Sequence, residues 1–282
     1  MRVFDNHCHA NELTGLGAEE VVKRFKRAGG VGVVFVSLLT WSIGGTPGDR
    51  GSVAKLYEHT VRNAQVARSH SLISGAVVGV HPAECIRLLE AGWRPAEVLE
   101  FMRWTVDLAA EYVKEGKAVG LGEYGRPHWP VDPAWRSLCD EVIKYAISRA
   151  RDVGAVVHLH LERNGLATVE SIAELAKAAG AKELQVVMHH IEPSAAVAAR
   201  ERGLAPSIPI GRRGELEQAL ALPPIYLVES DYIDDNKRPG AVIPPWTLAA
   251  KLRRAVEAGV IGESYVEELF KNAEAVYATL FH

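Results

Sequence analysis

The sequence predicts a single-domain (β/α)8 TIM barrel over residues 1–282, and three observations support this prediction. Short apolar runs alternate about eight times with longer stretches of helical periodicity, and no low-complexity linker divides the chain. Such alternation indicates a parallel sheet with helical crossovers, and eight units in roughly 250 residues is the usual size of such a barrel. In addition, six of the apolar runs end in a histidine or a carboxylate.

Eight apolar runs are expected to be buried parallel strands, because they are short and rich in Val, Leu and Ile. The seventh, residues 204–208, is the weakest prediction, since it contains Pro206 and proline is uncommon inside a sheet. The eight runs start near Arg2, Val31, Leu72, Ala118, Ala155, Leu184, Leu204 and Ile225.

Helices are expected in the amphipathic stretches between these runs. Most of the stretches stop at a glycine and several begin at a proline, as helix boundaries do. Two further segments, Thr40–Arg50 and Ser230–Trp246, are expected to be long rim loops that shape a pocket. The predicted helices are Glu19–Ala28, Ser52–Ser69, Pro95–Lys114, Pro133–Asp152, Leu166–Ala179 and Pro193–Arg202.

The composition limits the class of protein. The net charge of −3 argues against a protein that coats nucleic acid, although bound divalent ions would supply positive charge to a nuclease. The chain has no run of about 20 apolar residues that would span a bilayer, and its N-terminus leaves no room for a signal peptide. Three cysteines with no close pair argue against a disulfide framework. We therefore expect a cytoplasmic protein without a membrane association or an obligatory protein partner.

Histidines and carboxylates gather at the ends of the predicted strands. Seven of the eleven histidines lie there, and in parallel barrels the chemistry sits at the carboxyl ends of the strands. His7 and His9 are two residues apart on one strand, so both imidazoles face the same side. Such a set suits one or two divalent ions, of which Zn, Mn, Mg, Ni and Co are all compatible. The candidate metal ligands are His7, His9, Glu123, His160, His189 and Asp231.

Some of these positions have alternatives. Glu123 either bridges two cations or forms a salt bridge to Arg126. His158 and His160 share a strand face, and His160 is preferred because it lies nearer the end of the run. His189 and His190 are adjacent, so only one is expected to face the barrel interior, and His189 is preferred. A slip of one residue in strand phase would reverse these choices.

Four residues are expected to have roles in catalysis, in substrate binding or on the rim of the site. Asp231 ends the eighth strand, where a carboxylate binds metal and also accepts a proton from an attacking water. His81 ends the third strand and is either a ligand, a support for one, or a substrate-binding group. Arg126 and His128 are expected on the rim, where Arg126 would contact substrate oxygens.

The motifs resemble the TatD family of metal-dependent hydrolases, within the amidohydrolase-like barrels. The similar pieces span the whole chain in the family's order, and the likeness is greatest to a TatD-related archaeal group, which has stretches similar to residues 122–127 and 231–240. The pieces are Asp5–His9, Gly79–Pro82, Gly122–Gly125, His160, His189 and Glu229–Asp231.

The resemblance implies a site for up to two ions. One ion would take His7, His9, Glu123 and Asp231, and the other would take Glu123, His160 and His189. Members of the family resemble nucleases that act on DNA, and some relatives act on aminoacyl-tRNA esters. The resemblance does not supply the substrate of the archaeal group.

One departure from the family pattern concerns phosphate. The nuclease members usually carry a Ser-Arg or similar pair after the fifth-strand histidine, whereas here His160 is followed by Leu161 and Glu162, with Arg163 next. This weakens the DNA interpretation. Glu162 is expected to bind metal or substrate, or to cap the next helix.

Three hypotheses follow. The leading one is a metal-dependent hydrolase of a phosphodiester, resembling a deoxyribonuclease, in which Asp231 orients and deprotonates the water and His81, Arg126 and Glu162 are candidate substrate contacts. The second keeps the site but changes the bond to a carboxylic ester, a lactone, an amide or an aminoacyl-tRNA ester. The third is a barrel that binds metal and a ligand without catalysis. The expected partner is a small-molecule or nucleic-acid substrate.

Overall fold

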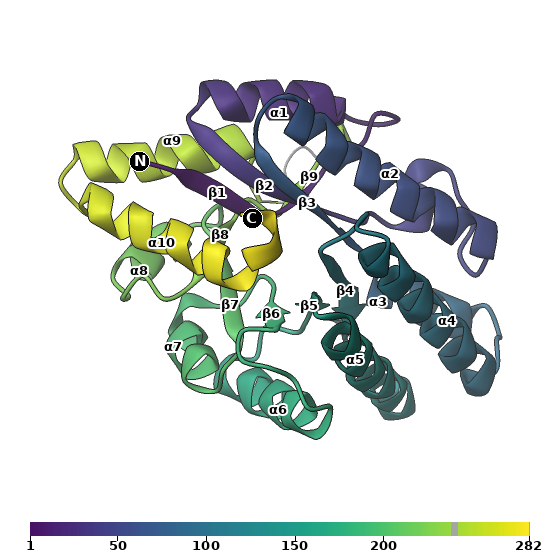
Figure 1. The fold of residues 1–282 in the computed structure, drawn as a ribbon. Coiled ribbons are helices and arrows are strands. Elements are labelled where there is room, and N and C mark those ends of the chain that lie inside the picture. Colours follow the sequence, from purple (N-terminus) through teal and green to yellow (C-terminus); the bar gives the residue numbers. More distant parts are fainter. Residues whose placement is uncertain (238–241, 282) are drawn as a thin grey trace.

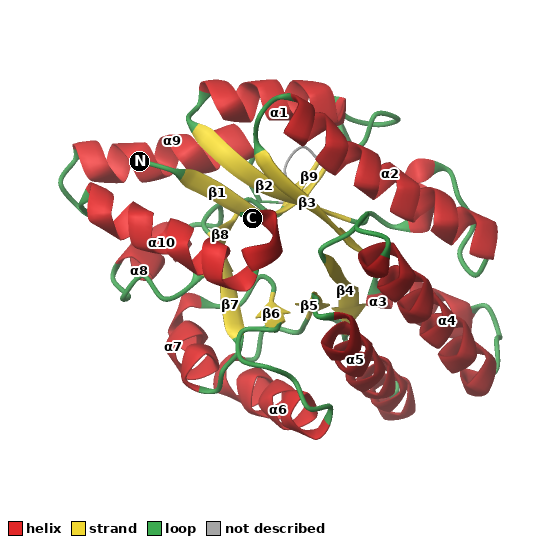
Figure 2. Ribbon diagram, in the orientation of Figure 1, coloured by secondary structure: helices red, strands yellow, loops and turns green. Residues whose placement is uncertain are grey.

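In the described part of the chain, nine parallel strands, the last of only two residues, form a barrel inside a ring of helices (Figures 1 and 2). The computed structural model describes residues 1–237 and 242–281. The end of the motif at residues 231–240 and part of the loop Ser230–Trp246 lie outside the described residues. The strands are β1 (Val3–His9), β2 (Gly30–Val36), β3 (Ile73–Val78), β4 (Gly120–Gly125), β5 (Val156–His160), β6 (Val186–Met188), β7 (Ala205–Pro209), β8 (Leu227–Glu229) and β9 (Tyr232–Ile233).

The barrel closes through a break in its last strand. The strand order is β8-β7-β6-β5-β4-β3-β2-β1-β9, with every pair parallel. The short strand β9 follows β8 after Ser230 and Asp231 and pairs with the end of β1. The Ser230 N–H also donates to Asp5 Oδ1 at 2.8 Å, and the Asp231 N–H donates to the His7 carbonyl at 3.1 Å. The last strand therefore joins the first at the level of His7.

The predicted strands are all present, including β7 with its proline. The six predicted helices are also present with small differences at their ends, but four further α-helices were not predicted. One of these, α3, starts directly after His81. The helices are α1 (Gly17–Arg27), α2 (Arg50–Ser69), α3 (Pro82–Glu90), α4 (Pro95–Lys114), α5 (Pro133–Val153), α6 (Gly165–Ala178), α7 (Pro193–Glu201), α8 (Glu215–Leu220), α9 (Pro245–Glu257) and α10 (Glu263–Val276), with 3-10 turns η1 (Thr40–Ile43) and η2 (Ala278–Leu280).

Two apolar clusters stabilise this arrangement. The larger lies between the strands and the outer helices. The smaller fills the barrel interior with inward-facing residues such as Phe4, Val77 and Val187, and it includes Phe270 and Tyr277 from α10 and the turn that follows it. The C-terminal segment thus covers the end of the barrel opposite the strand-end rim, as its position over the centre of the strands in Figure 1 shows.

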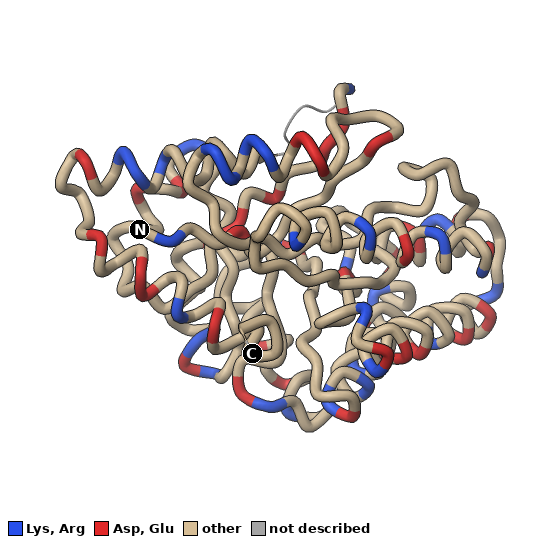
Figure 3. Tube along the Cα trace, turned by 45° about the horizontal axis from the view of Figure 1, so that its top comes forward, with Lys and Arg blue, Asp and Glu red and all other residues tan. Residues whose placement is uncertain are grey.

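Charged residues of both signs are interspersed along the outer helices (Figure 3). Within residues 1–237 and 242–281, no helix is long and apolar enough to cross a membrane. All three cysteines are buried and free, although Cys85 of α3 and Cys139 of α5 are distant in sequence and neighbours in space.

Candidate metal centre

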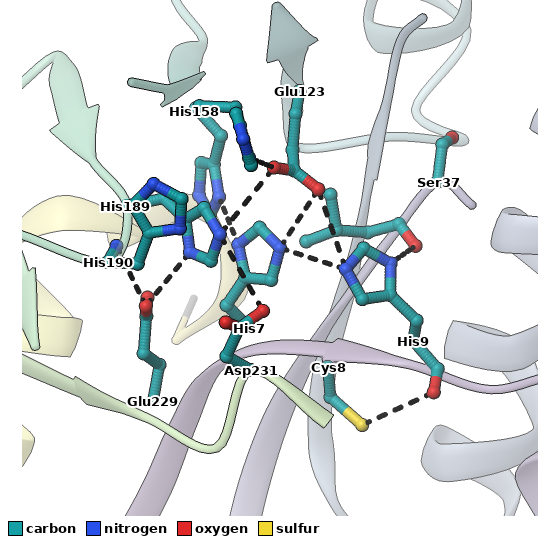
Figure 4. A network of polar contacts seen from close by, with 12 residues as sticks. His7, Cys8, His9, Ser37, Glu123, His158, His189, His190, Glu229 and Asp231 are labelled. Carbon is teal, nitrogen blue, oxygen red and sulfur yellow. Dashed lines mark hydrogen bonds and ion pairs between the residues drawn. The ribbon is translucent and has the colours of Figure 1, made fainter. Parts of the chain in front are cut away.

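Six predicted ligands meet at the carboxyl ends of the strands. His7 and His9 come from β1, Glu123 from β4 and His160 from β5, while His189 and Asp231 follow β6 and β8 directly. All six are buried, and five of them line one cavity of about 700 Å³, with His7 just beneath its floor. Figure 4 shows His7, His9 and His189 pointing towards Glu123, with Asp231 joined to His189.

The first group of ligand atoms lies around Glu123 Oε1. His7 Nε2 is 3.1 Å from His9 Nε2 and 3.3 Å from Glu123 Oε1, and His9 Nε2 is 3.5 Å from the same oxygen. Asp231 offers an oxygen within 4.8 Å of the ligand atoms of His7 and His9. The second group lies around the other oxygen: Glu123 Oε2 is 3.0 Å from His160 Nδ1 and 3.6 Å from His189 Nε2. Glu123 thus presents one oxygen to each group, which is the geometry that a bridging carboxylate needs.

The hydrogen-bond partner of His9 indicates that the first group of ligand atoms fits a cation. His9 Nδ1 lies 2.9 Å from the Val36 carbonyl, and a carbonyl only accepts, so this nitrogen carries the hydrogen and His9 Nε2 is left with a lone pair. That lone pair faces a carboxylate oxygen and a second imidazole nitrogen. Electron pairs packed together without a shared hydrogen repel, and a divalent ion between them removes the repulsion. The described residues therefore fit a divalent metal.

Local backbone conformations turn the residues after β6 and β8 inward. Asp231 and His190 are non-glycine residues with φ of 49° and 48°, a left-handed conformation that is uncommon for L-residues and often marks functional sites. It directs Asp231 towards His189, whose Nε2 is 3.7 Å from Asp231 Oδ1. It also places His190 on the cavity wall beside His189. The expectation that only one of this pair faces the interior is therefore wrong, because the strand ends at Met188 and side-chain alternation ends with it.

Glycines allow β4 to approach β5 closely. Gly122 and Gly125 have φ of 143° and 148°, and a Cβ on Gly122 would lie 2.6 Å from the His158 carbonyl oxygen. A side chain at either position would push the strands apart. This close approach brings Glu123 within reach of His160.

His158 and His160 occupy different layers of the barrel. His160 lies at the cavity and contacts Glu123, whereas His158 lies below it with Nδ1 3.3 Å from His7 Nδ1 and Nε2 2.6 Å from the Tyr277 hydroxyl. His158 therefore supports His7 from beneath and does not reach Glu123.

His81 presents a hydrogen-bond donor to the cavity. Its Nδ1 accepts a hydrogen bond from the Ala83 N–H at 3.0 Å, which caps α3. A neutral imidazole that accepts at Nδ1 carries its hydrogen at Nε2, and burial lowers the pKa of His81 well below its usual range. In this tautomer His81 presents an N–H, and no lone pair, at Nε2.

The structure does not bring Arg126 and Glu162 to the cavity. Arg126 is 1% exposed and donates to Asp140, Glu162 and Ser171, so it pairs with these residues and not with Glu123. Glu162 accepts from Arg126 and from Arg136 at 2.5 Å. Both residues join β4, β5 and the helices behind them, which explains the carboxylate at position 162 without a substrate contact.

Several cavity residues were not predicted as site residues. Arg163, the residue after Glu162, lines the cavity and pairs with Glu215. Arg212 follows β7 and lines the same wall, and Trp41 of η1 and Lys237 complete the rim. The loops after strands seven and eight often bind phosphate in such barrels, and this rule would have identified Arg212. His128, expected on the rim, contacts His160 Nε2 through its Nδ1 at 2.9 Å.

The electrostatics of the site reflect a dense group of buried charges. Burial raises the pKa of Asp231 well above its usual range, with the Glu123 carboxylate adding to this and Arg212 opposing it. Burial also favours a raised pKa for Glu123, but the neighbouring imidazoles of His7, His189 and His160 outweigh burial and hold it well below its usual range. Burial lowers the pKa of His9 to about 4. A neutral His9 imidazole and an ionised Glu123 are the protonation states that metal ligation requires.

The fold and this buried ligand set define a class: a metal-dependent hydrolase built on a (β/α)8 barrel. The chain belongs to the TatD related DNase family, whose model matches residues 4–278. It is 32% identical to the uncharacterized protein MJ1127 of Methanocaldococcus jannaschii over an alignment of 286 residues, which covers 98% of this chain and 95% of the relative.

Solved structures share the fold at low sequence identity. The phosphotriesterase homology protein from Escherichia coli, complexed with phosphate in its active site, superimposes with a TM-score of 0.65 at 13% identity and 98% coverage of both chains. The organophosphorus hydrolase from Deinococcus radiodurans gives a TM-score of 0.61 at 16% identity, over 98% of this chain and 92% of that one.

Proposed function

We propose that the protein hydrolyses a phosphodiester with one or two divalent ions, in the manner of a deoxyribonuclease. The observation that supports this best is the position of Asp231, a carboxylate turned into the cavity beside His7, His9 and His189, under a wall that carries Arg163 and Arg212. We further propose that the ligands are those predicted: His7, His9, Glu123 and Asp231 for one ion, and Glu123, His160 and His189 for the other.

The residues of the chain divide the chemical work. Bound divalent ions lower the pKa of a water molecule and polarise the ester. Asp231 orients that water and accepts its proton. The His81 Nε2–H donates to a non-bridging or leaving oxygen, while Arg163 and Arg212 meet the negative charge of the phosphate.

The alternative substrate is a carboxylic ester or a lactone. Leu38, Leu39, Trp41 and Ile233 form an apolar part of the cavity wall, and a volume of about 700 Å³ suits a small organic molecule. In this case the two arginines would meet a carboxylate of the substrate.

A substrate panel separates the two alternatives. The purified protein would be loaded with Mg²⁺, Mn²⁺ or Zn²⁺ and assayed on a labelled single-stranded DNA oligonucleotide, on bis(p-nitrophenyl) phosphate, on p-nitrophenyl acetate and on a γ-lactone. We expect metal-dependent cleavage of the phosphodiesters. Asp231→Asn should lower it by about 10²- to 10⁴-fold with the fold retained, whereas Asp152→Asn, which removes an exposed carboxylate on α5, should be active.

Two results would overturn parts of this proposal. Turnover of the acetate or the lactone, with inert phosphodiesters, would reject the phosphodiester assignment while keeping the metal centre. Full activity of Asp231→Asn would reject the role of Asp231.

A further inference from the structure

A continuous file of buried polar side chains runs beneath the candidate ligands, from His7 to His189. None of its five members belongs to the proposed ligand set, and none is more than 2% exposed. They come from four strands and from the residue that follows α10, so the file crosses the barrel. Its members, in order from His7, are His158, Tyr277, Asn6, Ser207 and Glu229.

The first half of the file determines which nitrogen of His7 carries the hydrogen. The Tyr277 hydroxyl donates to Asn6 Oδ1 at 2.5 Å, so its oxygen accepts from His158 Nε2 at 2.6 Å. His158 Nδ1 then has a lone pair, and it lies 3.3 Å from His7 Nδ1. His7 Nδ1 therefore carries the hydrogen, which leaves a lone pair on His7 Nε2, the atom that faces Glu123 and His9.

The second half reaches His189. Asn6 Nδ2 donates to Ser207 Oγ at 2.7 Å, and the Ser207 hydroxyl donates to Glu229 Oε2 at 2.5 Å. Glu229 Oε1 accepts from the His190 N–H at 2.8 Å and lies 2.9 Å from His189 Nδ1. The latter contact is not aligned as a hydrogen bond, but a carboxylate at this distance favours a hydrogen on His189 Nδ1. His189 Nε2 is thereby left to face Glu123 and Asp231.

We propose that Tyr277 is a positioning residue for the metal centre, which fixes His7 through His158 and, through Asn6, Ser207 and Glu229, favours the same tautomer in His189. From His7 to Glu229 each contact in the file has one donor and one acceptor, and each donor direction follows from the next. Groups that hydrogen-bond to metal-ligating histidines fix ring orientation and tautomer, and their loss typically weakens metal affinity about 10- to 100-fold.

The packing of Tyr277 suits this role. Its ring stacks on Phe4 of β1, with 6.0 Å between ring centroids and an interplanar angle of 25°. Phe4 in turn packs edge to face on Phe270 of α10. An apolar cluster at the end of the barrel opposite the strand-end rim therefore holds the Tyr277 ring, and its hydroxyl points through the interior to His158.

The test compares two buried tyrosines. Tyr277→Phe removes the hydroxyl from the file. Tyr226→Phe removes a buried hydroxyl that contacts only the Ala219 carbonyl and Tyr265 among the described residues. Affinity for Zn²⁺ and Mn²⁺ would be measured by competition with a chromophoric chelator, alongside thermal unfolding of the metal-free proteins. We expect Tyr277→Phe to weaken metal binding by about tenfold or more, and Tyr226→Phe to leave it unchanged even where it lowers thermal stability.

A second variant tests whether the file acts as a unit. Ser207→Ala interrupts it between Asn6 and Glu229, and it also serves if Tyr277→Phe does not fold. If the file acts as one unit, the double variant Tyr277→Phe/Ser207→Ala should lose less metal affinity than the fold-losses of the two single variants multiplied together. A loss of affinity equal to that product would show that Tyr277 and Ser207 support the metal centre independently, and would overturn the connection through Asn6.

The inference rests on the proposed metal centre, and the same experiment separates the two. No divalent-ion binding by the unaltered protein would reject the proposed function itself. Tight binding that Tyr277→Phe leaves unchanged would reject only the role of Tyr277.

Discussion

At the scale of single residues, the tautomer of each histidine decides what it contributes. His9 and His81 both line the cavity, yet their Nδ1 atoms meet opposite partners: His9 faces the Val36 carbonyl and His81 faces the Ala83 N–H. His9 is left with a lone pair for a cation, and His81 is left with an N–H for an anion. Sequence position alone gives no sign of this difference, because both histidines end an apolar run.

His81→Ala should therefore separate catalysis from metal binding. We expect turnover to fall by about 10²- to 10³-fold, as when one donor to a developing negative charge is removed, with unchanged metal content. Metal content after dialysis and kcat would be measured together, with His59→Ala as the control, since His59 of α2 pairs with Glu12 away from the cavity. Loss of a bound ion in His81→Ala would make it a ligand and contradict the donor assignment.

At the scale of elements, helix α3 holds a wall of the cavity. Glu84 is fully buried and accepts from the Thr40 N–H at 2.8 Å and the Thr40 hydroxyl at 2.7 Å. The Arg87 guanidinium lies 4.7 Å from the centre of the Trp41 ring. Since Trp41 lines the cavity, α3 fixes the position of the η1 turn there.

This attachment predicts a pH dependence of stability. Burial raises the pKa of Glu84 to about 7, so the folded state holds this proton more tightly than the unfolded chain does. Protonated Glu84 stabilises the fold fully below pH about 4.5. As the pH rises to about 7 and above, the free energy of unfolding falls by about 3 kcal/mol. The free energy of unfolding of Glu84→Gln should therefore rise relative to the unaltered protein between pH 4.5 and pH 8.

Urea unfolding at both pH values would measure this difference, with Glu90→Gln at the exposed end of α3 as the control. An offset between Glu84→Gln and the unaltered protein that does not vary with pH would show that Glu84 titrates as an ordinary carboxylate.

The contact between β4 and β5 predicts a position-specific effect of glycine replacement. Gly125→Ala should destabilise the protein by about 2 kcal/mol or more, because the new Cβ would overlap the His160 backbone and φ is 148°. Gly116→Ala is the matched control: its φ is 70° with no atom within 4 Å of a new Cβ, so it should cost about 1 kcal/mol. Equal losses in denaturant unfolding would show that the close approach of the strands is unimportant.

At the scale of the whole molecule, the sequence predicted the barrel and its strand ends well. The strands are uniform apolar runs, and the parallel arrangement brings their ends together whatever the details of the loops. The prediction failed where the direction of a side chain depends on the backbone just after a strand ends, because strand alternation no longer applies there. The left-handed conformation at His190 puts two adjacent histidines on one wall, and the turn of Glu162 towards Arg126 removes both from the cavity. Tyr277 could not have been found, because the C-terminal segment carries no motif.

Metal removal should lower the stability of the whole barrel, because the proposed ligands come from β1, β4 and β5 and from the residues after β6 and β8, and bind only in the folded state. At an ion concentration about 100 times Kd the stabilisation is about 2.7 kcal/mol, which corresponds to a fall in Tm of about 5–10 °C on chelation for a domain of this size. Calorimetry with and without chelator measures it, and readdition of the ion should restore Tm. An unchanged Tm would contradict a resident metal.

The closure of the barrel has a consequence for how the protein is made. His7 is synthesised well before Asp231, which lies on the segment that completes the sheet, and before Tyr277, which follows α10. The full set of candidate ligands is therefore absent from any nascent chain that ends before Asp231, including one that already carries His7, His9, Glu123 and His160. The proposed hydrolytic activity would therefore begin only after the strand that closes the barrel has been synthesised.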